Sequence, residues 1–265
     1  MQKRPLLDIP DSVTRSAADF YEQHLAIMLQ YSIGEMIIGS HERFVVSAGK
    51  ALATDGMSPA EVFPEAFAEL EALKGYIEET RPSRLEVALS RTVENFLSYV
   101  SDILTEAIIA RPDLLRTQEQ VTLEEVLNHQ SIEDFVRWAA ERRVSQLSFK
   151  GLDEIASYVE KRLGMKLQSS DGDWDTLTQS IAVRNIIVHR RSIADERFLW
   201  AMKGETEVKL GEKFQVPREA LAQTMKCAMK IVRGFDARVA EKFDILLLSS
   251  ADQEWYEKVG GAAGD

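Results

Sequence analysis

The sequence predicts an all-α protein, a helical bundle that carries one short β-hairpin near residues 206–216. Three observations lead to this prediction. Apolar residues recur at intervals of three and four along most of the chain, as they do on the buried face of a helix. Serine residues that can cap a helix stand directly before several of these stretches. With 45% hydrophobic residues, the chain also has enough apolar side chains for a packed core.

The first predicted helix extends from Asp11 to about Val46, where the sequence carries few end signals. A clearer helix start follows at Ser58, because Pro59 stands in the first turn and Glu61 can complete a capping box. Two helices are therefore expected in the first eighty residues.

A long helix is predicted to begin at Ser83, with Glu86 as its capping partner, and to end before Pro112. Its apolar residues would form one buried face and are Leu85, Leu89, Val93, Phe96, Val100, Ile103 and Ala107.

Two further helices are predicted in the middle of the chain. Ser131 and Asp134 resemble an N-cap and its partner at the start of the helix Ile132–Val144. The second helix, Leu152–Leu163, is expected to end at Gly164.

The segment TEVKLGEKFQV differs from the rest, because its apolar and polar residues alternate. Val208 and Leu210 precede the turn residue Gly211, and Phe214 and Val216 follow it. This pattern is typical of a β-hairpin.

Helical spacing returns after Pro217 and predicts a long closing helix through Leu221, Met225, Ala228, Val232, Phe235, Val239 and Leu246. For the domain organisation, we expect residues 1–82 to form a helical extension packed on the bundle. Residues 83–250 would form the main helical domain, and 251–265, which end in GGAAGD, a disordered tail.

Composition excludes several classes of protein. The single cysteine, Cys227, cannot form an intrachain disulfide and favours a small core residue in a reducing compartment. The N-terminus has no apolar signal region, and the longest apolar stretch is too short to span a membrane. A net charge of −11 argues against a general nucleic-acid coat protein. We therefore expect a cytoplasmic protein without membrane contact, in which any anion site is local.

No pattern in the sequence predicts a metal ion or cofactor. DGDWD at 171–175 resembles a calcium loop at three ligand positions, but Thr176 replaces the required glycine and Ala182 the required glutamate. We interpret the stretch as a loop and the acidic first turn of a helix. Four scattered histidines and one cysteine also make a poor zinc site.

The stretch VRNIIVHRRS at 183–192 is the strongest candidate for a site. On a helix from Trp174, Arg184 falls within an apolar stripe, and a charge there must be paired or must face a polar cleft. Asn185 and His189 are four residues apart and lie on one face, toward which Arg184 can bend. The apolar residues of this stripe are Trp174, Leu177, Ile181 and Val188.

The spacing alone leaves two interpretations open. Arg184 could pair with a core carboxylate while His189 caps the helix end, which would be a purely structural arrangement. The three polar side chains, with Asn185, could instead converge on a ligand.

The wider stretch RNIIVHRRSIADERF, followed by EVKLGEKFQV and a long helix, resembles the HEPN superfamily over roughly residues 85–245. The Arg-polar-x-x-x-His motif of its ribonuclease branch falls on Arg184, Asn185 and His189. One departure is Arg190, where such proteins often have asparagine. The trailing stretch falls on Asp195, Glu196, Arg197 and Phe198.

This resemblance implies a HEPN-like fold and a metal-independent endoribonuclease that cleaves RNA by attack of its own 2′-hydroxyl. His189 would exchange the proton, Arg184 would bind the phosphate as charge develops, and Asn185 would hold the imidazole or a phosphate oxygen. The positive patch that binds RNA would consist of Arg190, Arg191 and Arg197.

The resemblance also implies a homodimer through the 174–190 helix, since two such motifs meet at the dimer interface in HEPN-like ribonucleases. A role as a toxin or phage-defence effector would add an antitoxin or defence-system partner protein. The alternative is a non-catalytic HEPN-like dimerisation or nucleotide-binding module that acts with a partner protein.

Overall fold

A computed structural model of the chain describes residues 9–54, 57–115, 121–148, 152–168 and 171–249. Helices dominate this part of the chain and confirm the all-α class. The helices are α1 (Arg15–Leu52), α2 (Pro59–Val62), α3 (Pro64–Ala110), α4 (Leu123–Leu127), α5 (Ile132–Ser148), α6 (Leu152–Tyr158), α7 (Asp171–Arg190), α8 (Glu196–Ala201) and α9 (Arg218–Phe243). A 3₁₀ turn η1 (Pro112–Leu115), a π-helical turn η2 (Val159–Leu163) and the strands β1 (Ser12–Val13) and β2 (Leu248–Ser249) complete them.

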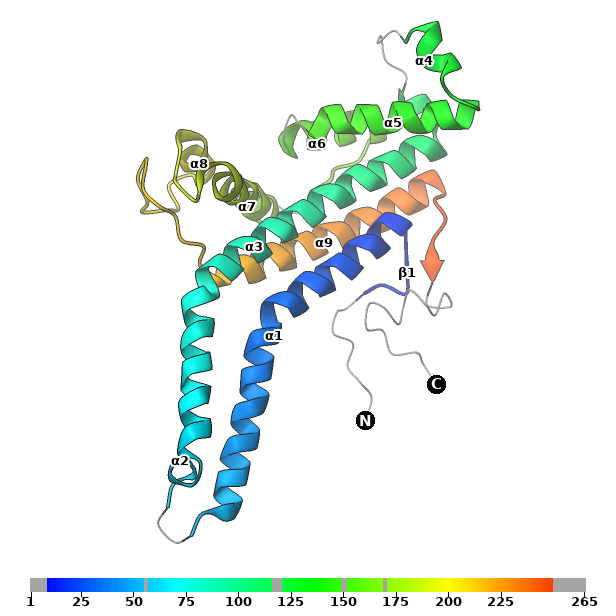
Figure 1. Cartoon of the computed structure of the whole chain (residues 1–265). Coiled ribbons are helices and arrows are strands. Elements are labelled where there is room, and N and C mark those ends of the chain that lie inside the picture. Colours follow the sequence, from blue (N-terminus) through cyan, green and yellow to red (C-terminus); the bar gives the residue numbers. More distant parts are fainter. Residues whose placement is uncertain (1–8, 55–56, 116–120, 149–151, 169–170, 250–265) are drawn as a thin grey trace.

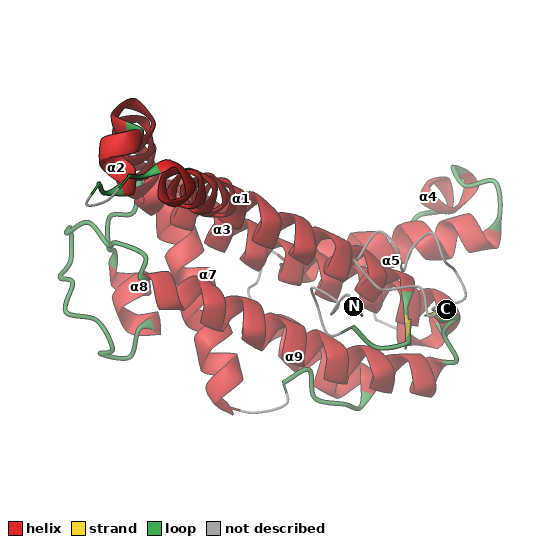
Figure 2. Cartoon of the chain, turned by 90° about the horizontal axis from the view of Figure 1, so that it is seen from below, coloured by secondary structure: helices red, strands yellow, loops and turns green. Residues whose placement is uncertain are grey.

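The molecule consists of a helical body and a projecting arm (Figure 1). The N-terminal part of α1, the C-terminal part of α3 and α9 lie side by side in the body, with α5 and α6 at one end and α7 and α8 toward the other (Figures 1 and 2). The remaining halves of α1 and α3 continue as an antiparallel pair away from the body, and α2 lies at their tip. We call this pair the arm; it comprises α1 from Tyr31 and α3 up to Pro82.

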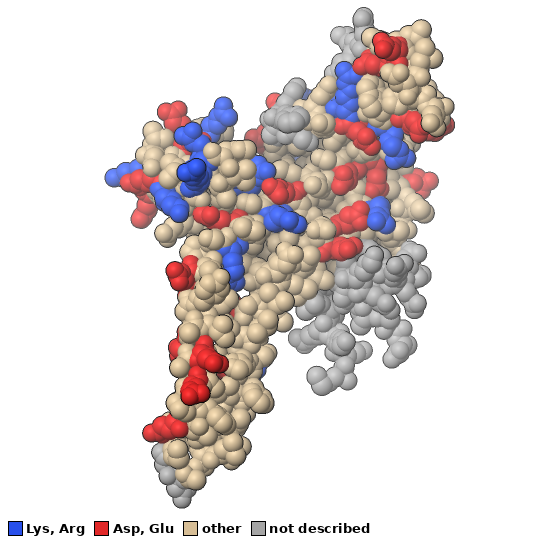
Figure 3. Space-filling view, viewed as in Figure 1, with Lys and Arg blue, Asp and Glu red and all other residues tan. Residues whose placement is uncertain are grey.

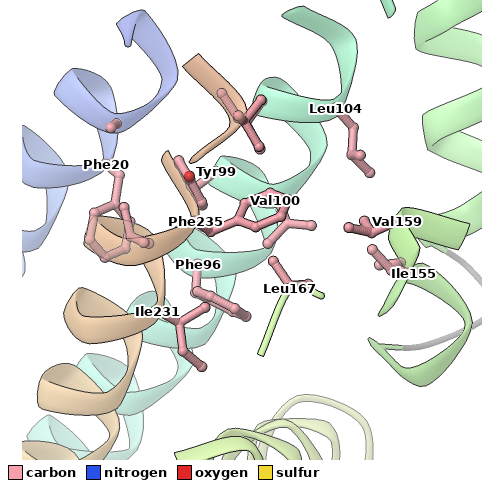
Figure 4. Packing of buried hydrophobic residues seen from close by; sticks show 14 of the residues in the cluster. Phe20, Phe96, Tyr99, Val100, Leu104, Ile155, Val159, Leu167, Ile231 and Phe235 are labelled. Carbon is pink, nitrogen blue, oxygen red and sulfur yellow. The ribbon is translucent and has the colours of Figure 1, made fainter. Parts of the chain in front are cut away.

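The core of the body lies where α1, α3, α9 and the α6–η2 segment meet (Figure 4). The fully buried side chains there include Phe96 and Tyr99 from α3, Phe20 from α1 and Phe235 from α9. Burial of an apolar side chain of this size contributes about 1.5–3 kcal/mol, so this cluster dominates the stability of the body.

Helix α1 is fixed to α9 by a buried polar contact at its first turn. The backbone N–H of Thr14 donates to Oδ2 of Asp236 at 3.0 Å, and its hydroxyl donates to Oδ1 at 2.5 Å. The Tyr99 hydroxyl donates to the same carboxylate at 3.4 Å. Strand β1 directly precedes Thr14 and pairs antiparallel with β2, with Val13 opposite Leu248. The two ends of the described chain therefore lie together.

Several predicted helix ends are confirmed. Ser58 and Glu61 form the capping box of α2. The hydroxyl of Ser131 accepts a hydrogen bond from the Asp134 N–H at 3.1 Å in front of α5. Gly164 ends the α6–η2 segment with φ +64°, a left-handed conformation that favours glycine.

The predicted helix start at Ser83 is wrong, because α3 runs without a break from Pro64 to Ala110. The boundary expected after residue 82 therefore falls inside a helix. Pro82 removes one backbone N–H, and Figure 1 shows α3 changing direction where the arm joins the body. The Arg84 guanidinium donates to the carbonyls of Ile77 and Tyr31, each at 3.0 Å, and so links α3 to α1 at this bend.

The β-hairpin predicted near 206–216 is also wrong. This segment forms a loop with a turn at Gly211, φ +83°, and the turn is bridged to residues 192–194 in place of a second strand of the same segment. Ala194 exchanges backbone hydrogen bonds with Gly211 and Glu212, both at 2.9 Å. The two strands within the described residues are β1 and β2. The tail predicted at 251–265 lies outside the described residues.

Within the described ranges, no helix is long and apolar enough to cross a membrane.

Candidate functional site

Helix α7 is held against α9 by its N-terminal half. The predicted acidic first turn is helical, and Asp173 accepts a hydrogen bond from Lys230 of α9 at 2.5 Å. Further along, the hydroxyls of Ser180 and Thr224 lie 2.7 Å apart in the interface between these helices. The N-terminal half of α7 therefore serves to attach this helix to α9.

The buried side of α7 differs from the predicted stripe. Trp174 and Leu177 are buried as expected, but Val188 is 49% exposed and Ile186 is 1% exposed. Ile186 packs with α3, α8 and the loop before α9 in a second apolar cluster that also contains Leu89, Phe198, Phe214 and Leu221. The apolar side chains of α7 are thus buried largely by other parts of this chain.

The chain reverses directly after α7 so that α8 returns beside it. Arg191 and Ser192 adopt left-handed conformations, with φ of +53° and +65°. Such residues are strained by about 1 kcal/mol or more, and buried hydrogen bonds offset this strain. The Ser192 N–H donates to the carbonyl of Ile186 at 3.0 Å, and its hydroxyl donates to Glu86 of α3 at 2.6 Å.

Helix α8 is positioned by the loop that was expected to be a hairpin. The Asp195 carboxylate caps α8 by accepting the Phe198 N–H at 2.9 Å. The Phe198 ring packs edge-on against Phe214 of the loop, with centroids 5.0 Å apart. The loop is itself tied to Ser192 through the Phe214 N–H at 2.7 Å.

A groove of about 890 Å³ opens between α7 and α8. Its apolar lining comes mainly from Ile181, Ala182, Ile186, Phe198 and Ala201. Its polar lining consists of Thr178, Asn185, His189, Arg190, Asp195, Glu196 and Arg197. A mainly apolar concave surface with a few polar groups at its rim is typical of a ligand site.

Four of the six predicted site residues line this groove, namely Asn185, His189, Arg190 and Arg197. Asn185 and His189 lie one helical turn apart on the same side of α7, as the spacing predicted. Arg191 is exposed in the left-handed turn and is not among the lining residues.

Arg184 faces α3 and does not line the groove. Its Nη2 donates to Oε1 of Glu94 at 2.9 Å, so a carboxylate of the same chain neutralises it. Its Nη1 donates to Oδ1 of Asn185 at 3.3 Å, and this contact connects it to the groove wall. Nε of Arg184 is buried and has no hydrogen-bond partner among the described residues. Sequence reasoning had no local signal for Glu94, which is ninety positions away.

The groove is less acidic than the molecule as a whole. Its two arginines, Arg190 and Arg197, balance the two carboxylates Asp195 and Glu196, whereas the whole chain has a net charge of −11. Figure 3 shows Lys and Arg side chains grouped over the end of the molecule that holds α7 and α8, with acidic side chains between them.

Trp200 is a lining residue that the sequence reasoning missed. Its side chain is 80% exposed although it belongs to a short helix whose other aromatic residue, Phe198, is buried. The only available signal was its place in ERFLW, two positions after a core phenylalanine. An exposed indole beside cationic side chains can stack on a nucleobase.

The described residues contain no group of three or more His, Cys, Asp or Glu side chains that could hold a metal ion. Cys227 is buried on α9, and burial, followed by its hydrogen bond to Asp173, raises the pKa of its thiol. A raised pKa reduces the thiolate fraction at neutral pH and makes this cysteine a poor nucleophile.

Comparison of the chain with protein-family models, curated proteins and solved structures found no match in any of the three. The chemistry of the groove is therefore the basis on which a function can be inferred.

Proposed function

We propose that the groove between α7 and α8 binds RNA and that the protein is a metal-independent endoribonuclease of HEPN type. The observation that supports this proposal best is the convergence of His189, Asn185, Arg190 and Arg197 on one groove. All four belong to the site that the sequence predicts. Trp200 adds a stacking surface at the same place.

RNA supplies its own nucleophile, so the protein has two tasks. One is to move a proton at the 2′-hydroxyl or at the leaving oxygen, and the imidazole of His189 in the groove lining can accept or donate it. The other is to stabilise the charge that develops on the phosphate, which Arg190 and Arg197 can do from the groove lining. Neither arginine has an ion-pair partner in the ranges that the structure describes, so both are available to an anion.

Arg184 has a different role in this proposal from the phosphate contact that the motif implied. Glu94 occupies its Nη2 and Asn185 its Nη1. Because Oδ1 of Asn185 accepts from Arg184, the amide nitrogen of Asn185 is left to donate to a phosphate oxygen or to the imidazole. Arg184 is thus a positioning residue that acts through Asn185.

A homodimer remains part of the proposal. The resemblance implies an interface through the 174–190 helix, and the exposed apolar side chains of the arm offer a competing one. In a single chain Val188, Asn185 and His189 are exposed on α7, and a second copy of α7 could cover them. A role as a toxin or phage-defence effector, controlled by an antitoxin or other partner protein, follows only from the resemblance to HEPN proteins.

One observation favours a second candidate function. The Arg184–Glu94 ion pair lies within one chain, as expected if the motif is structural. The protein would then be a non-catalytic HEPN-like module for dimerisation or nucleotide binding, and the groove would hold a nucleotide without cleaving it.

The test compares purified wild type with His189→Ala in RNA cleavage. Loss of a general acid or base costs about 10²–10⁴-fold in rate, and His41→Ala, which removes an exposed histidine from the arm, should cost nothing. EDTA should leave cleavage unchanged, products should carry a 2′,3′-cyclic phosphate, and RNA with a 2′-deoxy sugar at the cleaved position should resist.

The role of Arg184 is tested by a double-mutant cycle. If it acts through Asn185, Arg184→Ala and Asn185→Ala should each slow cleavage, and the double variant should be no slower than the worse single variant. Additive losses would mean that Arg184 contacts RNA itself. If RNA binds but no substrate is cleaved, the non-catalytic function takes precedence.

A further inference from the structure

The arm has an apolar face that no part of the described chain covers. Its exposed side chains come from both helices: Ile33, Met36, Ile37 and Phe44 of α1 are 56%, 58%, 62% and 70% exposed, and Leu73 and Tyr76 of α3 are 49% and 64% exposed. A surface of neighbouring apolar side chains on a projecting element marks an interaction site.

These side chains lie on the same side of the arm. Between the helices, Val45 and Leu70 are buried, and a Cβ on Gly34 would lie 2.7 Å from Ile77. Ile33, Ile37, Phe44 and Tyr76 each directly precede a less exposed residue on the side that faces the other helix, namely Gly34, Ile38, Val45 and Ile77. Leu73 lies one helical turn before Tyr76 and so shares its side.

Moving one residue toward the N-terminus of a helix turns the direction of the side chain by about 100°. The turn has the same sense in α1 and in α3 when each is viewed along its own chain direction. Because α1 and α3 are antiparallel, the two stripes therefore emerge on one side of the pair. We call this surface the arm face. Figure 3 shows it as a broad uncharged area with acidic side chains along the α3 edge.

The opposite side of the arm carries charged side chains that form ion pairs within the chain. Lys74 bridges Glu42 at 2.8 Å and Glu71 at 3.0 Å, and Glu35 is 3.3 Å from Arg218 at the start of α9. The arm therefore resembles one half of a helical bundle, with a charged outer side and an apolar inner side that lacks its second layer.

We propose that a second copy of this chain supplies that layer, so that two arms pack face to face as an intermolecular four-helix bundle. From Tyr31 to Leu52 the arm is about 33 Å long, at about 1.5 Å per residue, and two helices are about 20 Å wide. The face thus offers roughly 660 Å² per copy and roughly 1,300 Å² in total, which falls within the range of stable interfaces.

The arm face also carries a protrusion and a hollow that fit this symmetry. Phe44 projects toward the tip, and a hollow of about 250 Å³ lies at the base, where Tyr31 and Val87 are among its lining residues. A twofold axis near Ile37 would exchange these two positions in an antiparallel pair of arms. The same arrangement separates the acidic tips, where Glu69 would otherwise face its own copy.

The test measures the mass of the full chain by light scattering at micromolar concentration. We expect a dimer for wild type, a monomer for Ile37→Glu, and a dimer for Leu246→Glu, which places the same charge at another exposed apolar residue. Val188→Glu should also stay dimeric, which separates this interface from one through α7. Circular dichroism should be the same for all four proteins, since each residue is exposed.

The antiparallel orientation of the two arms in the dimer is tested by a separate cross-linking experiment. Ile37→Cys should form a disulfide-linked dimer under mild oxidation, because the twofold axis brings the two copies of residue 37 together. A monomeric wild type would overturn the proposal and point to a different protein as the occupant of the arm face. A dimer that survives Ile37→Glu, or an Ile37→Cys variant that does not cross-link, would overturn it equally.

Discussion

Acid should destabilise this protein through one buried histidine. His24 lies on α1 beside Phe20, with ring centroids 5.3 Å apart, and only 1% of it is exposed. Its Nδ1 has no hydrogen-bond partner among the described residues. Burial disfavours the charged imidazolium and lowers the pKa of His24 from 6.5 to about 4.

The direction of the effect follows from proton binding. Between about pH 4 and pH 6.5 the unfolded chain binds a proton at His24 that the folded chain does not, so the free energy of unfolding falls as the pH falls. At about 1.4 kcal/mol per pKa unit, the loss relative to neutral pH is about 2 kcal/mol at pH 5 and about 3 kcal/mol below about pH 4, where the folded chain binds the proton as well. Domains of this kind are stable by about 5–15 kcal/mol, so the loss is readily measured.

The loss of unfolding free energy in acid can be measured by urea unfolding of wild type and His24→Leu at pH 7 and pH 5. The difference between the two proteins should shift by about 2 kcal/mol in favour of His24→Leu at pH 5. Burial raises the pKa of Asp236, whose contribution therefore has the opposite sign, but it is common to both proteins and cancels. His41→Leu, at an exposed position, should follow wild type. Parallel pH profiles for His24→Leu and wild type would refute the assignment of a neutral buried imidazole.

Two further predictions concern the groove. Glu94→Gln should lower the free energy of unfolding by less than about 1 kcal/mol in urea denaturation, because Glu94 and Arg184 are 44% and 24% exposed; a loss of several kcal/mol would contradict this. Asp195→Ala removes the cap that accepts the Phe198 N–H and should cost about 1 kcal/mol. It should also weaken RNA binding measured by anisotropy and change Trp200 fluorescence, and unchanged affinity would show that α8 needs no cap to form the groove.

Local signals in the sequence were sufficient for most helix ends. A cap depends on residues within one turn, so Ser58, Ser131 and Gly164 could be recognised without knowledge of their surroundings. The same local rule failed at Ser83, where α3 continues because its contacts with α1 extend on both sides of Pro82, from Lys74 to Glu42 before it and from Arg84 to Tyr31 after it. A cap signal says where a helix can begin, and tertiary packing decides whether it does.

Pairing partners could not be predicted from local pattern. Alternation around Gly211 predicted a hairpin, but only its turn is present, and the backbone groups that pair with it belong to Ser192 and Ala194. Spacing similarly brought Asn185 and His189 to one side of α7 and gave no indication that Glu94 would hold Arg184. Trp200 was missed because exposure, not residue type, distinguishes it from a core aromatic.

The contact between Thr14 and Asp236 has a consequence for synthesis of the protein on the ribosome. The first turn of α1 is completed by a carboxylate 222 positions later in the chain. The core cluster that contains Phe20 is likewise completed, by Phe235 and its neighbours, only after α9 has emerged. Contacts of such sequence separation form late, so the growing chain must hold an incomplete core for most of its translation. At about 5–20 residues per second, α1 waits for roughly 10–40 seconds, and during that time the chain presents apolar surface to chaperones.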